Sequence, residues 1–219
     1  MKTATLGPDH TISRVIRGGW QLAGGHGSIE HDRAIDDLIA SADAGITTFD
    51  CADIYTGVEA LMGAFRERYA NERGSDALSK IRVHTKYVPD LSALRDLTRA
   101  DVETAIRGSA ERLGTERIDL VQFHWWDYSV DGVERMYERL LYLQSTGKIR
   151  LLGTTNFNTQ RLQQLLGMNP SIVSMQAQYS LLDRRPERRM LRSCLDNGVG
   201  LLAYGVLSGG FLTDYYLAR

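Results

Sequence analysis

Short, continuous apolar runs alternate with segments of helical character along most of the 219 residues. The runs have the length of β-strands and lie at Arg14–Trp20, Gly45–Phe49, Ile81–Thr85, Ile118–Phe123, Ile149–Gly153, Ile172–Met175 and Val199–Ala203. Because these runs are continuously apolar rather than alternating, we expect strands that are buried on both faces. The pattern therefore predicts seven strands that alternate with six helices.

Three of the segments between the runs carry apolar residues at helical spacing. These residues are Ile35, Leu38, Ile39 and Ala42 in the first, Val102, Ala105, Ile106, Ala110 and Leu113 in the second, and Met190, Leu191, Cys194 and Leu195 in the third. A glycine follows each segment, at Gly45, Gly114 and Gly198, where a helix C-terminal cap is expected. Pro186 is placed for the first turn of the third helix, and residues 71–80 are expected to form a polar loop.

Strands that alternate with helices are expected to pair in parallel, because each helix returns the chain to the same end of the sheet. A doubly wound open sheet and a (β/α) barrel of the TIM type both fit this pattern. Gly18 and Gly19 lead into Trp20 and Gln21 rather than into G-x-G-x-x-G, which counts against a dinucleotide-binding fingerprint. Polar residues follow several strands, at the end where barrel enzymes hold their active sites, and this favours the barrel.

Four polar residues lie at or near the ends of the second, third and fourth runs, namely Asp50, Tyr55, Lys86 and His124. A tyrosine hydroxyl has an ordinary pKa of about 10, and a nearby ammonium lowers that pKa. We expect Lys86 to supply this charge, Asp50 to hold Lys86 through a charge-assisted hydrogen bond, and His124 to orient a carbonyl oxygen. Such a site protonates an oxygen but offers no nucleophile and no metal cage. A cofactor is therefore expected to carry the other half of the reaction.

Composition and charge are those of an ordinary globular protein and bear on whether the chain binds nucleic acid. The chain is 43% hydrophobic and 24% charged, and 26 basic residues against 27 acidic ones give a net charge of -1. This balance predicts no nucleic-acid partner. The densest basic run, Arg184-Arg185-Pro186-Glu187-Arg188-Arg189, is interpreted as the solvated start of a helix.

The cysteines and the lack of an apolar targeting segment indicate the cellular compartment in which the chain is expected. Cys51 and Cys194 are far apart and have no metal-ligand spacing, which favours a reducing compartment and predicts no metal site. We expect Cys51 to act as a small buried apolar residue. The N-terminus lacks an apolar signal core, and no stretch approaches membrane-spanning length. These features predict a cytoplasmic protein without a membrane partner.

Several longer motifs occur in order along the chain. They are Gly45-Ile-Thr-Thr-Phe-Asp50-Cys-Ala-Asp-Ile-Tyr55, Asp119-Leu-Val-Gln-Phe-His124, Gly147-Lys-Ile-Arg150 with Gly153-Thr-Thr-Asn-Phe157, Gln176-Ala-Gln-Tyr-Ser180 and Leu202-Ala-Tyr-Gly-Val-Leu-Ser208-Gly-Gly210. On these motifs the chain resembles the aldo-keto reductase family over essentially its whole length. Cys51 and Thr56 depart from the usual pattern of the first motif, but neither is the proposed proton-transfer group.

The resemblance implies a (β/α)8 barrel that reduces an aldehyde or ketone to an alcohol with NADPH, with NADH as the alternative cofactor. It makes Tyr55 the general acid, Lys86 and Asp50 its pKa-tuning partners, and His124 the residue that orients the substrate. The matching cofactor positions are Thr155, Asn156 and Gln176 for the nicotinamide carboxamide, Tyr204 for stacking on the ring, and Leu207, Ser208 and Gly210 for the turn at the pyrophosphate. Trp20, Trp125 and Trp126 would face the small-molecule carbonyl substrate, with packing inside the barrel as the alternative.

The seventh run ends near Tyr204 and the sequence stops at Arg219, although a complete barrel needs eight strands and about 250 residues. We therefore expect one domain over residues 1–219 with about seven of the eight βα units. The eighth strand and the segment that holds the cofactor phosphate would be missing, as in a truncated reductase. Unpaired strand edges would make a homo-oligomer possible. The rival hypothesis is a non-catalytic or weakly active subunit that senses the cofactor or binds a partner.

Overall fold

The computed structural model describes residues 1–24, 27 and 29–216 of the chain. An antiparallel hairpin, β1 (Thr3–Gly7) and β2 (His10–Ser13), precedes a single seven-stranded sheet. The sheet consists of β3 (Arg17–Gly18), β4 (Thr48–Asp50), β5 (Arg82–Tyr87), β6 (Ile118–Phe123), β7 (Ile149–Thr155), β8 (Ser174–Gln178) and β9 (Gly200–Tyr204). Neighbours in the sheet follow the order of the chain, and every pair is parallel, as the sequence predicts.

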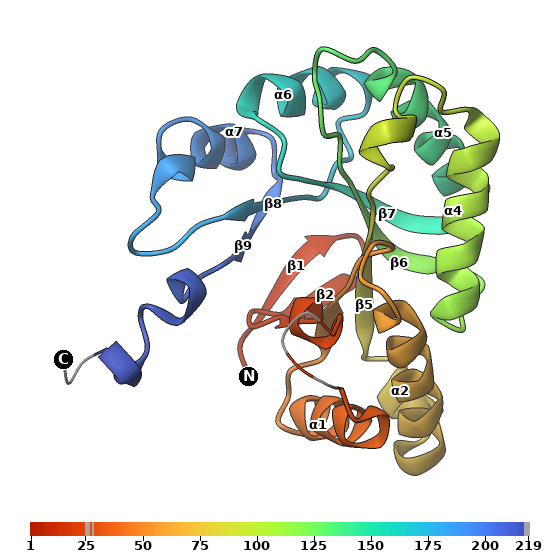
Figure 1. Ribbon diagram of the computed structural model, residues 1–219, viewed down its shortest axis with the longest axis vertical. Coiled ribbons are helices and arrows are strands. Elements are labelled where there is room, and N and C mark those ends of the chain that lie inside the picture. The colour runs from red at the N-terminus through yellow and green to blue at the C-terminus, as the bar shows by residue number, and fades with distance from the viewer. Residues whose placement is uncertain (25–26, 28, 217–219) are drawn as a thin grey trace.

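Helices connect the strands and cover the outer side of the curled sheet (Figure 1). They are α1 (His31–Asp43), α2 (Val58–Arg73), α3 (Ser75–Leu78), α4 (Arg99–Arg112), α5 (Val133–Ser145), α6 (Thr159–Met168) and α7 (Met190–Asp196). A curled parallel sheet with helices outside is the arrangement of the (β/α) barrel, which confirms the predicted fold class.

The main core lies between the sheet and the helices. On α1 the predicted face is buried, with Leu38 fully inaccessible to solvent. From the sheet, Phe49 and Val121 are equally inaccessible and belong to the same apolar cluster. Burial of one such side chain contributes roughly 1.5–3 kcal/mol, so this layer fixes how each helix lies on the strands and where the strand ends are held.

Three predicted elements differ in the structure. The first apolar run pairs as a strand only at Arg17–Gly18. Residues 71–80 are largely helical rather than a loop, because α2 continues to Arg73 and α3 follows after Gly74, whose positive φ of 86° separates the two helices. The helix expected from Pro186 is divided into a 3-10 helix, Arg185–Glu187, and α7, because the backbone leaves helical geometry between them.

The N-terminal hairpin, which the sequence analysis missed, lies within the curve of the sheet (Figure 1). Leu6 of β1 packs against a small buried cluster of Leu120, Leu151 and Val173. Gly200 makes room for this contact, since a Cβ there would lie 2.4 Å from Leu6 Cδ2. The hairpin therefore fills the space enclosed by the curled sheet, on the side away from the C-terminal ends of the strands.

Two histidines join the hairpin to the sheet. The Nε2 atoms of His10 and His84 lie 3.0 Å apart, both residues are fully buried, and the rings stack with centroids 5.3 Å apart. Among the described residues neither Nδ1 atom has a hydrogen-bond partner. Burial lowers the pKa of His10 to about 4, although Asp119 opposes the shift, and burial lowers the pKa of His84 well below 6.5. Both rings are therefore neutral at neutral pH.

We expect the free energy of unfolding to fall as the pH is lowered from 6.5 toward 4. Both imidazoles bind protons near pH 6.5 once the chain unfolds but stay neutral in the fold, so acid favours the unfolded chain. The integrated loss from His10 alone is about 3 kcal/mol. Urea unfolding followed across this pH range measures the loss, and His10→Asn should flatten the dependence. A free energy that is constant down to about pH 4.5 would contradict the buried neutral pair.

Candidate active site

The C-terminal ends of β4 and β5 bring a lysine and an aspartate into a buried ion pair. Lys86 Nζ contacts Asp50 Oδ2 directly and donates a second hydrogen bond to Cys51 O at 2.8 Å. Lys86 is 6% exposed and Asp50 is 8% exposed. Burial by itself would lower the pKa of Lys86, but the Asp50 carboxylate and its hydrogen bond outweigh burial and raise that pKa. The site therefore holds a permanent ammonium at neutral pH.

The second oxygen of the Asp50 carboxylate accepts hydrogen bonds from two buried amides. Gln122 Nε2 donates at 2.7 Å and Gln176 Nε2 at 3.1 Å. One carboxylate thus links β4, β5, β6 and β8. Gln122 was not predicted as a site residue, although it lies on β6 two residues before His124, which places both side chains on the same face of the sheet.

Tyr55 lies between β4 and α2, next to this ion pair. Its half-buried ring is 4.9 Å from Lys86 Nζ and meets the edge of Trp20 with centroids 5.0 Å apart. Burial raises the pKa of Tyr55 above 10, and the charge of Lys86 lowers it only in part. The prediction of a lowered pKa was therefore wrong in its net direction. Loss of water and the nearby Asp50 carboxylate oppose the phenolate more than the ammonium favours it.

Asp53, which the sequence analysis also did not select, fixes the Tyr55 loop to the end of β5. Its carboxylate accepts hydrogen bonds from Val88 N at 3.0 and 3.2 Å and from Ile54 N at 2.8 Å, and its own N–H donates to Lys86 O at 3.3 Å. Burial raises the pKa of Asp53 to about 7. The segment that carries Tyr55 is therefore clamped to the strand that carries Lys86.

His124 follows directly after β6 and is oriented by the next strand. Its Nδ1 lies 3.0 Å from Thr155 O, and a carbonyl oxygen only accepts hydrogen bonds, so Nδ1 carries the proton. Burial lowers the pKa of His124 below its ordinary value, although the bond to Thr155 opposes the shift. In the resulting neutral ring, Nε2 holds a lone pair.

The residues expected at the nicotinamide carboxamide lie together at the ends of β7, β8 and β9. Thr155 Oγ1 donates to Gln176 Oε1 at 3.4 Å, and Asn156 N donates to Gln176 O at 2.9 Å. Tyr204 OH donates to Asn156 Oδ1 at 2.9 Å, while the Tyr204 ring remains 39% exposed. Within the described chain the Asn156 amide N–H groups have no acceptor. A free amide donor, the Gln176 oxygen and an accessible aromatic face fit a nicotinamide ring with its carboxamide.

Leu207, Ser208 and Gly210 lie in the turn after β9, where the last of them closes a 3-10 helix, Ser208–Gly210. Ser208 has a positive φ of 50°, and its Oγ hydrogen-bonds with Ser180 Oγ at 2.9 Å. Leu207 is 53% exposed. The expected turn is therefore present on the same edge of the sheet as Tyr204.

The three tryptophans occupy different environments. Trp20 is 53% exposed beside Tyr55, and Trp126 is 49% exposed with its ring edge against His124 at a centroid distance of 4.5 Å. Trp125 is only 1% exposed, packs near Phe123, and donates its N–H to backbone carbonyls. The structure thus places Trp20 and Trp126 at the site and corrects the expectation for Trp125, which packs in the core.

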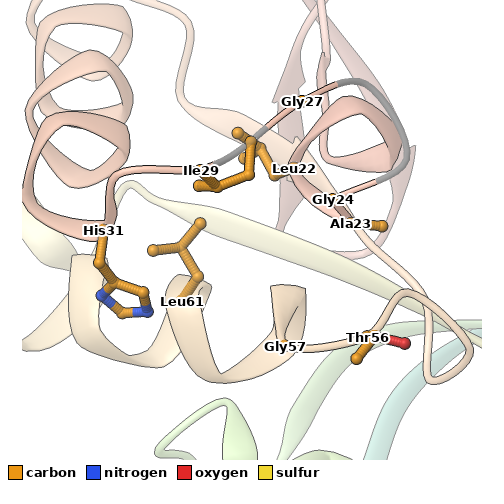
Figure 2. Close-up of a pocket in the computed structure, with 9 residues that line it drawn as sticks. All are labelled: Leu22, Ala23, Gly24, Gly27, Ile29, His31, Thr56, Gly57 and Leu61. Atoms are coloured by element: carbon orange, nitrogen blue, oxygen red, sulfur yellow. The ribbon is translucent and has the colours of Figure 1, made fainter.

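A separate hollow of about 490 Å³ lies between the segment after β3 and the start of α2 (Figure 2). Its lining residues include Leu22, Ile29, His31, Thr56 and Leu61. Asp50, Tyr55, Lys86 and His124 do not line it. The hollow therefore adjoins the Tyr55 loop through Thr56 but is distinct from the proton-transfer group.

Neither a membrane-spanning helix nor a metal-ligand cluster is found among the described residues. No helix in residues 1–24, 27 and 29–216 is both long and apolar enough to span a membrane. The same residues hold no group of three or more His, Cys, Asp or Glu side chains arranged for a metal ion. Cys51 is buried and donates its thiol hydrogen to His84 O at 3.3 Å, consistent with a packed rather than a reactive thiol.

Fold and site together define a barrel-type protein with a Tyr–Lys–Asp–His group at the C-terminal ends of parallel strands. The family model described as "Aldo/keto reductase family" matches residues 14–218. The chain belongs to the aldo/keto reductase family.

Curated relatives support this assignment. The chain is 28% identical to the NADH-specific methylglyoxal reductase of Escherichia coli over 97% of its own length and 69% of that protein. It is 30% identical to the aldo-keto reductase YhdN of Bacillus subtilis over 92% of its length and 60% of that protein. The chain therefore spans about two thirds of the length of the curated relatives it matches.

Solved structures of aldo-keto reductases also support the family assignment. An aldo-keto reductase from Bacillus halodurans, AKR11C1, superimposes with a TM-score of 0.81 at 26% identity over 98% of this chain and 69% of that one. The thermostable aldo-keto reductase Tm1743 gives a TM-score of 0.83 at 26% identity over 98% of this chain and 76% of that one.

Proposed function

We propose that this chain reduces an aldehyde or a ketone to an alcohol with a reduced nicotinamide dinucleotide. The observation that carries the proposal is the buried Lys86–Asp50 pair placed against the Tyr55 ring. Family membership supports it, and so do the names of the relatives, several of which are reductases. The ion pair holds the Lys86 ammonium beside the Tyr55 ring, where a positive charge stabilises the phenolate that forms when Tyr55 gives up its proton.

When bound, the reduced nicotinamide supplies a hydride to the carbonyl carbon. Tyr55 donates its hydroxyl proton to the carbonyl oxygen as the C=O π bond breaks, which yields the alcohol. The Lys86 ammonium stabilises the phenolate left on Tyr55, and water returns the proton. Asp50 acts through Lys86 by holding the ammonium in place.

The bond between His124 and Thr155 limits what the histidine does. Its neutral ring accepts a hydrogen bond at Nε2, and it donates one to a substrate oxygen only as the imidazolium. Because burial lowers the pKa of His124, the imidazolium is a minor form at neutral pH. We therefore assign to His124 the positioning of the reacting hydroxyl groups, with Trp20 and Trp126 as the walls that exclude water.

For the cofactor, we assign Asn156, Thr155 and Gln176 to the carboxamide, Tyr204 to the nicotinamide face, and the turn at 207–210 to the pyrophosphate. NADPH is the cofactor implied by the family resemblance, whereas the E. coli relative is named as NADH-specific. Either dinucleotide is therefore a candidate cofactor for this chain. The Asn156 amide donor and the exposed Tyr204 ring support the assignment.

The direction of the Tyr55 pKa shift predicts the pH dependence of reduction. A proton donor works only while protonated, and burial raises the pKa of Tyr55 above 10. We expect kcat for reduction to show no loss attributable to Tyr55 up to about pH 10 and to fall beyond it. Initial rates at saturating cofactor measure the profile. A rate that rises steadily with pH above 10 would contradict the role of Tyr55 as the acid.

The deciding experiment has two stages. NADPH and NADH are titrated into the purified chain, and energy transfer from tryptophan to the reduced nicotinamide reports binding. Turnover is then followed with methylglyoxal and with an aromatic aldehyde, since a relative is named for the first of these substrates. Saturable binding with turnover supports the proposal. Binding without turnover of any carbonyl would favour the cofactor-sensing alternative, and a folded chain that binds neither dinucleotide would overturn both.

A further inference from the structure

The loop between β4 and α2 holds Tyr55 among residues that are largely open to solvent. Ile54 is 49% exposed, and Thr56 and Gly57 are also exposed. The Tyr55 ring itself is half-buried beside Trp20. The residues next to Tyr55 in the sequence therefore add little apolar packing, and the place of the tyrosine depends on the hydrogen bonds that the loop makes.

One side chain ties this loop to the neighbouring strand. Asp53 Oδ1 accepts hydrogen bonds from Ile54 N at 2.8 Å and from Val88 N at 3.2 Å, and Asp53 Oδ2 accepts one from Val88 N at 3.0 Å. Val88 directly follows β5, the strand that carries Lys86. The carboxylate thus joins the residue before Tyr55 in the loop to the end of the strand that supplies the ammonium.

This geometry requires an ionised side chain. A carboxylate accepts hydrogen bonds at both oxygens, whereas a protonated carboxyl turns one oxygen into a donor. Oδ2 accepts only from Val88 N, while Oδ1 serves two donors, so Oδ2 is the oxygen more open to a proton. A proton on Oδ2 would face the Val88 N–H group, and the shorter of the two contacts from Val88 would be lost.

Burial opposes the charge that this geometry requires. It raises the pKa of Asp53 to about 7, although the backbone hydrogen bonds lower that pKa. The other side chains whose charge acts on Asp53 or responds to it are Glu59 of α2, Arg112 of α4 and Tyr87 of β5. Glu59 and Arg112 are paired with each other at 2.6 Å, and burial raises the pKa of Tyr87 above 10, which keeps it neutral. Asp53 therefore gains its proton as the pH falls through about 7.

We propose that Asp53 is a positioning residue: its carboxylate holds the Tyr55 loop on β5, and protonation of that carboxylate releases the loop. The effect on turnover rests on the proposed reductase function, whereas the effect on the loop does not. Asp53 acts through Tyr55, whose ring lies 4.9 Å from Lys86 Nζ. Because a shift of about 1 Å in a reacting group can lower a rate about 10²-fold, release of the loop should slow proton donation.

The kinetic test compares the unmodified chain with Asp53→Asn, which has the shape of the protonated carboxyl. At about pH 8.5 the variant should show a kcat at least about tenfold lower, with the dinucleotide Kd within about twofold, because the residues assigned to the cofactor lie on other strands. The kcat of the unmodified chain should fall toward that of the variant as the pH drops through about 7, and the variant should lack this step. His124 titrates in both chains, so the comparison removes its contribution. Identical profiles would overturn the proposal.

A second measurement, by nuclear magnetic resonance of the isotope-labelled chain, needs no turnover. The amide signals of Val88 and Ile54 should shift together with an apparent pKa of about 7 and should not do so in Asp53→Asn. At about pH 8 the Tyr55 amide, which donates to Ala52 O at 3.1 Å, should exchange with solvent at least about tenfold faster in the variant. Amide signals that do not titrate, or unchanged exchange, would overturn the proposal. If the unmodified chain reduces no carbonyl, the proposed function fails and these signals alone decide whether Asp53 holds the loop.

The matched control is Asp101→Asn. Asp101 is exposed in the first turn of α4, and its carboxylate also accepts a backbone hydrogen bond, from Thr98 N at 2.8 Å. The variant thus removes the same charge and the same kind of contact outside the site. It should leave kcat, its pH profile and exchange of the Tyr55 amide within about twofold of the unmodified chain. Equal losses in the two asparagine variants would show a general effect of the lost charge and would overturn the proposal.

Discussion

Tyr55→Phe is expected to lower kcat for carbonyl reduction by about 10²–10⁴-fold, the usual contribution of a positioned proton donor. The change removes one hydroxyl and leaves the ring against Trp20, so the fold and the cofactor Kd should remain as they are. Single-turnover reduction measures the chemical step, and tryptophan-to-nicotinamide energy transfer measures binding.

Two other tyrosine variants serve as controls for Tyr55→Phe. Tyr142→Phe changes a half-exposed residue of α5 outside the site and should leave both quantities unchanged. Tyr204→Phe removes the hydrogen bond to Asn156 and should weaken cofactor binding more than it slows the chemical step. If Tyr55→Phe retains full activity, Tyr55 is not the acid. If its only effect is on cofactor Kd, the tyrosine is a binding residue.

The architecture could be predicted because its signals are local. The apolar runs and their spacing identify the strands, and the parallel order follows because a helix lies between strands. Asp50, Lys86 and His124 could be selected because each stands at a strand end, and parallel strand ends meet at one edge. The sequence therefore predicts which residues gather there, even though they are far apart along the chain.

The remaining features depend on tertiary contacts that leave a weak local signal. Trp125 and Trp126 are adjacent in the sequence, and only packing shows that the first is buried in the core and the second lies against His124. The hairpin escaped notice because its strands are only five and four residues long and β1 contains no fully buried residue. Asp53 could not be selected because its role comes from the backbone of Val88, which has no signature in sequence.

The sign of the Tyr55 pKa shift was missed for a related reason. A neighbouring ammonium is evident from the motif, but the amount of water removed from the phenol is not. The structure shows that desolvation is the larger effect. It follows that Lys86 matters most after the proton has left, when the phenolate needs a counter-charge, rather than as a device that ionises the resting tyrosine.

Lys86→Met is expected to abolish reduction and to lower the free energy of unfolding by about 3–5 kcal/mol, the cost of leaving a buried charge without its partner. The buried Asp50 carboxylate would keep only the amides of Gln122 and Gln176. Urea unfolding at neutral pH measures the loss. Lys80→Met, at an exposed position, is the matched control and should change stability by less than about 0.5 kcal/mol.

The double variant Asp50→Asn/Lys86→Met separates stability from chemistry. Removing both charges leaves no isolated ion in the interior, so most of the lost stability should return. Activity should not return, because the phenolate of Tyr55 would still lack a counter-charge. Recovery of turnover in the double variant would show that Lys86 serves only to neutralise Asp50. Continued instability would show that the Lys86–Cys51 hydrogen bond, rather than the ion pair, holds this edge of the sheet.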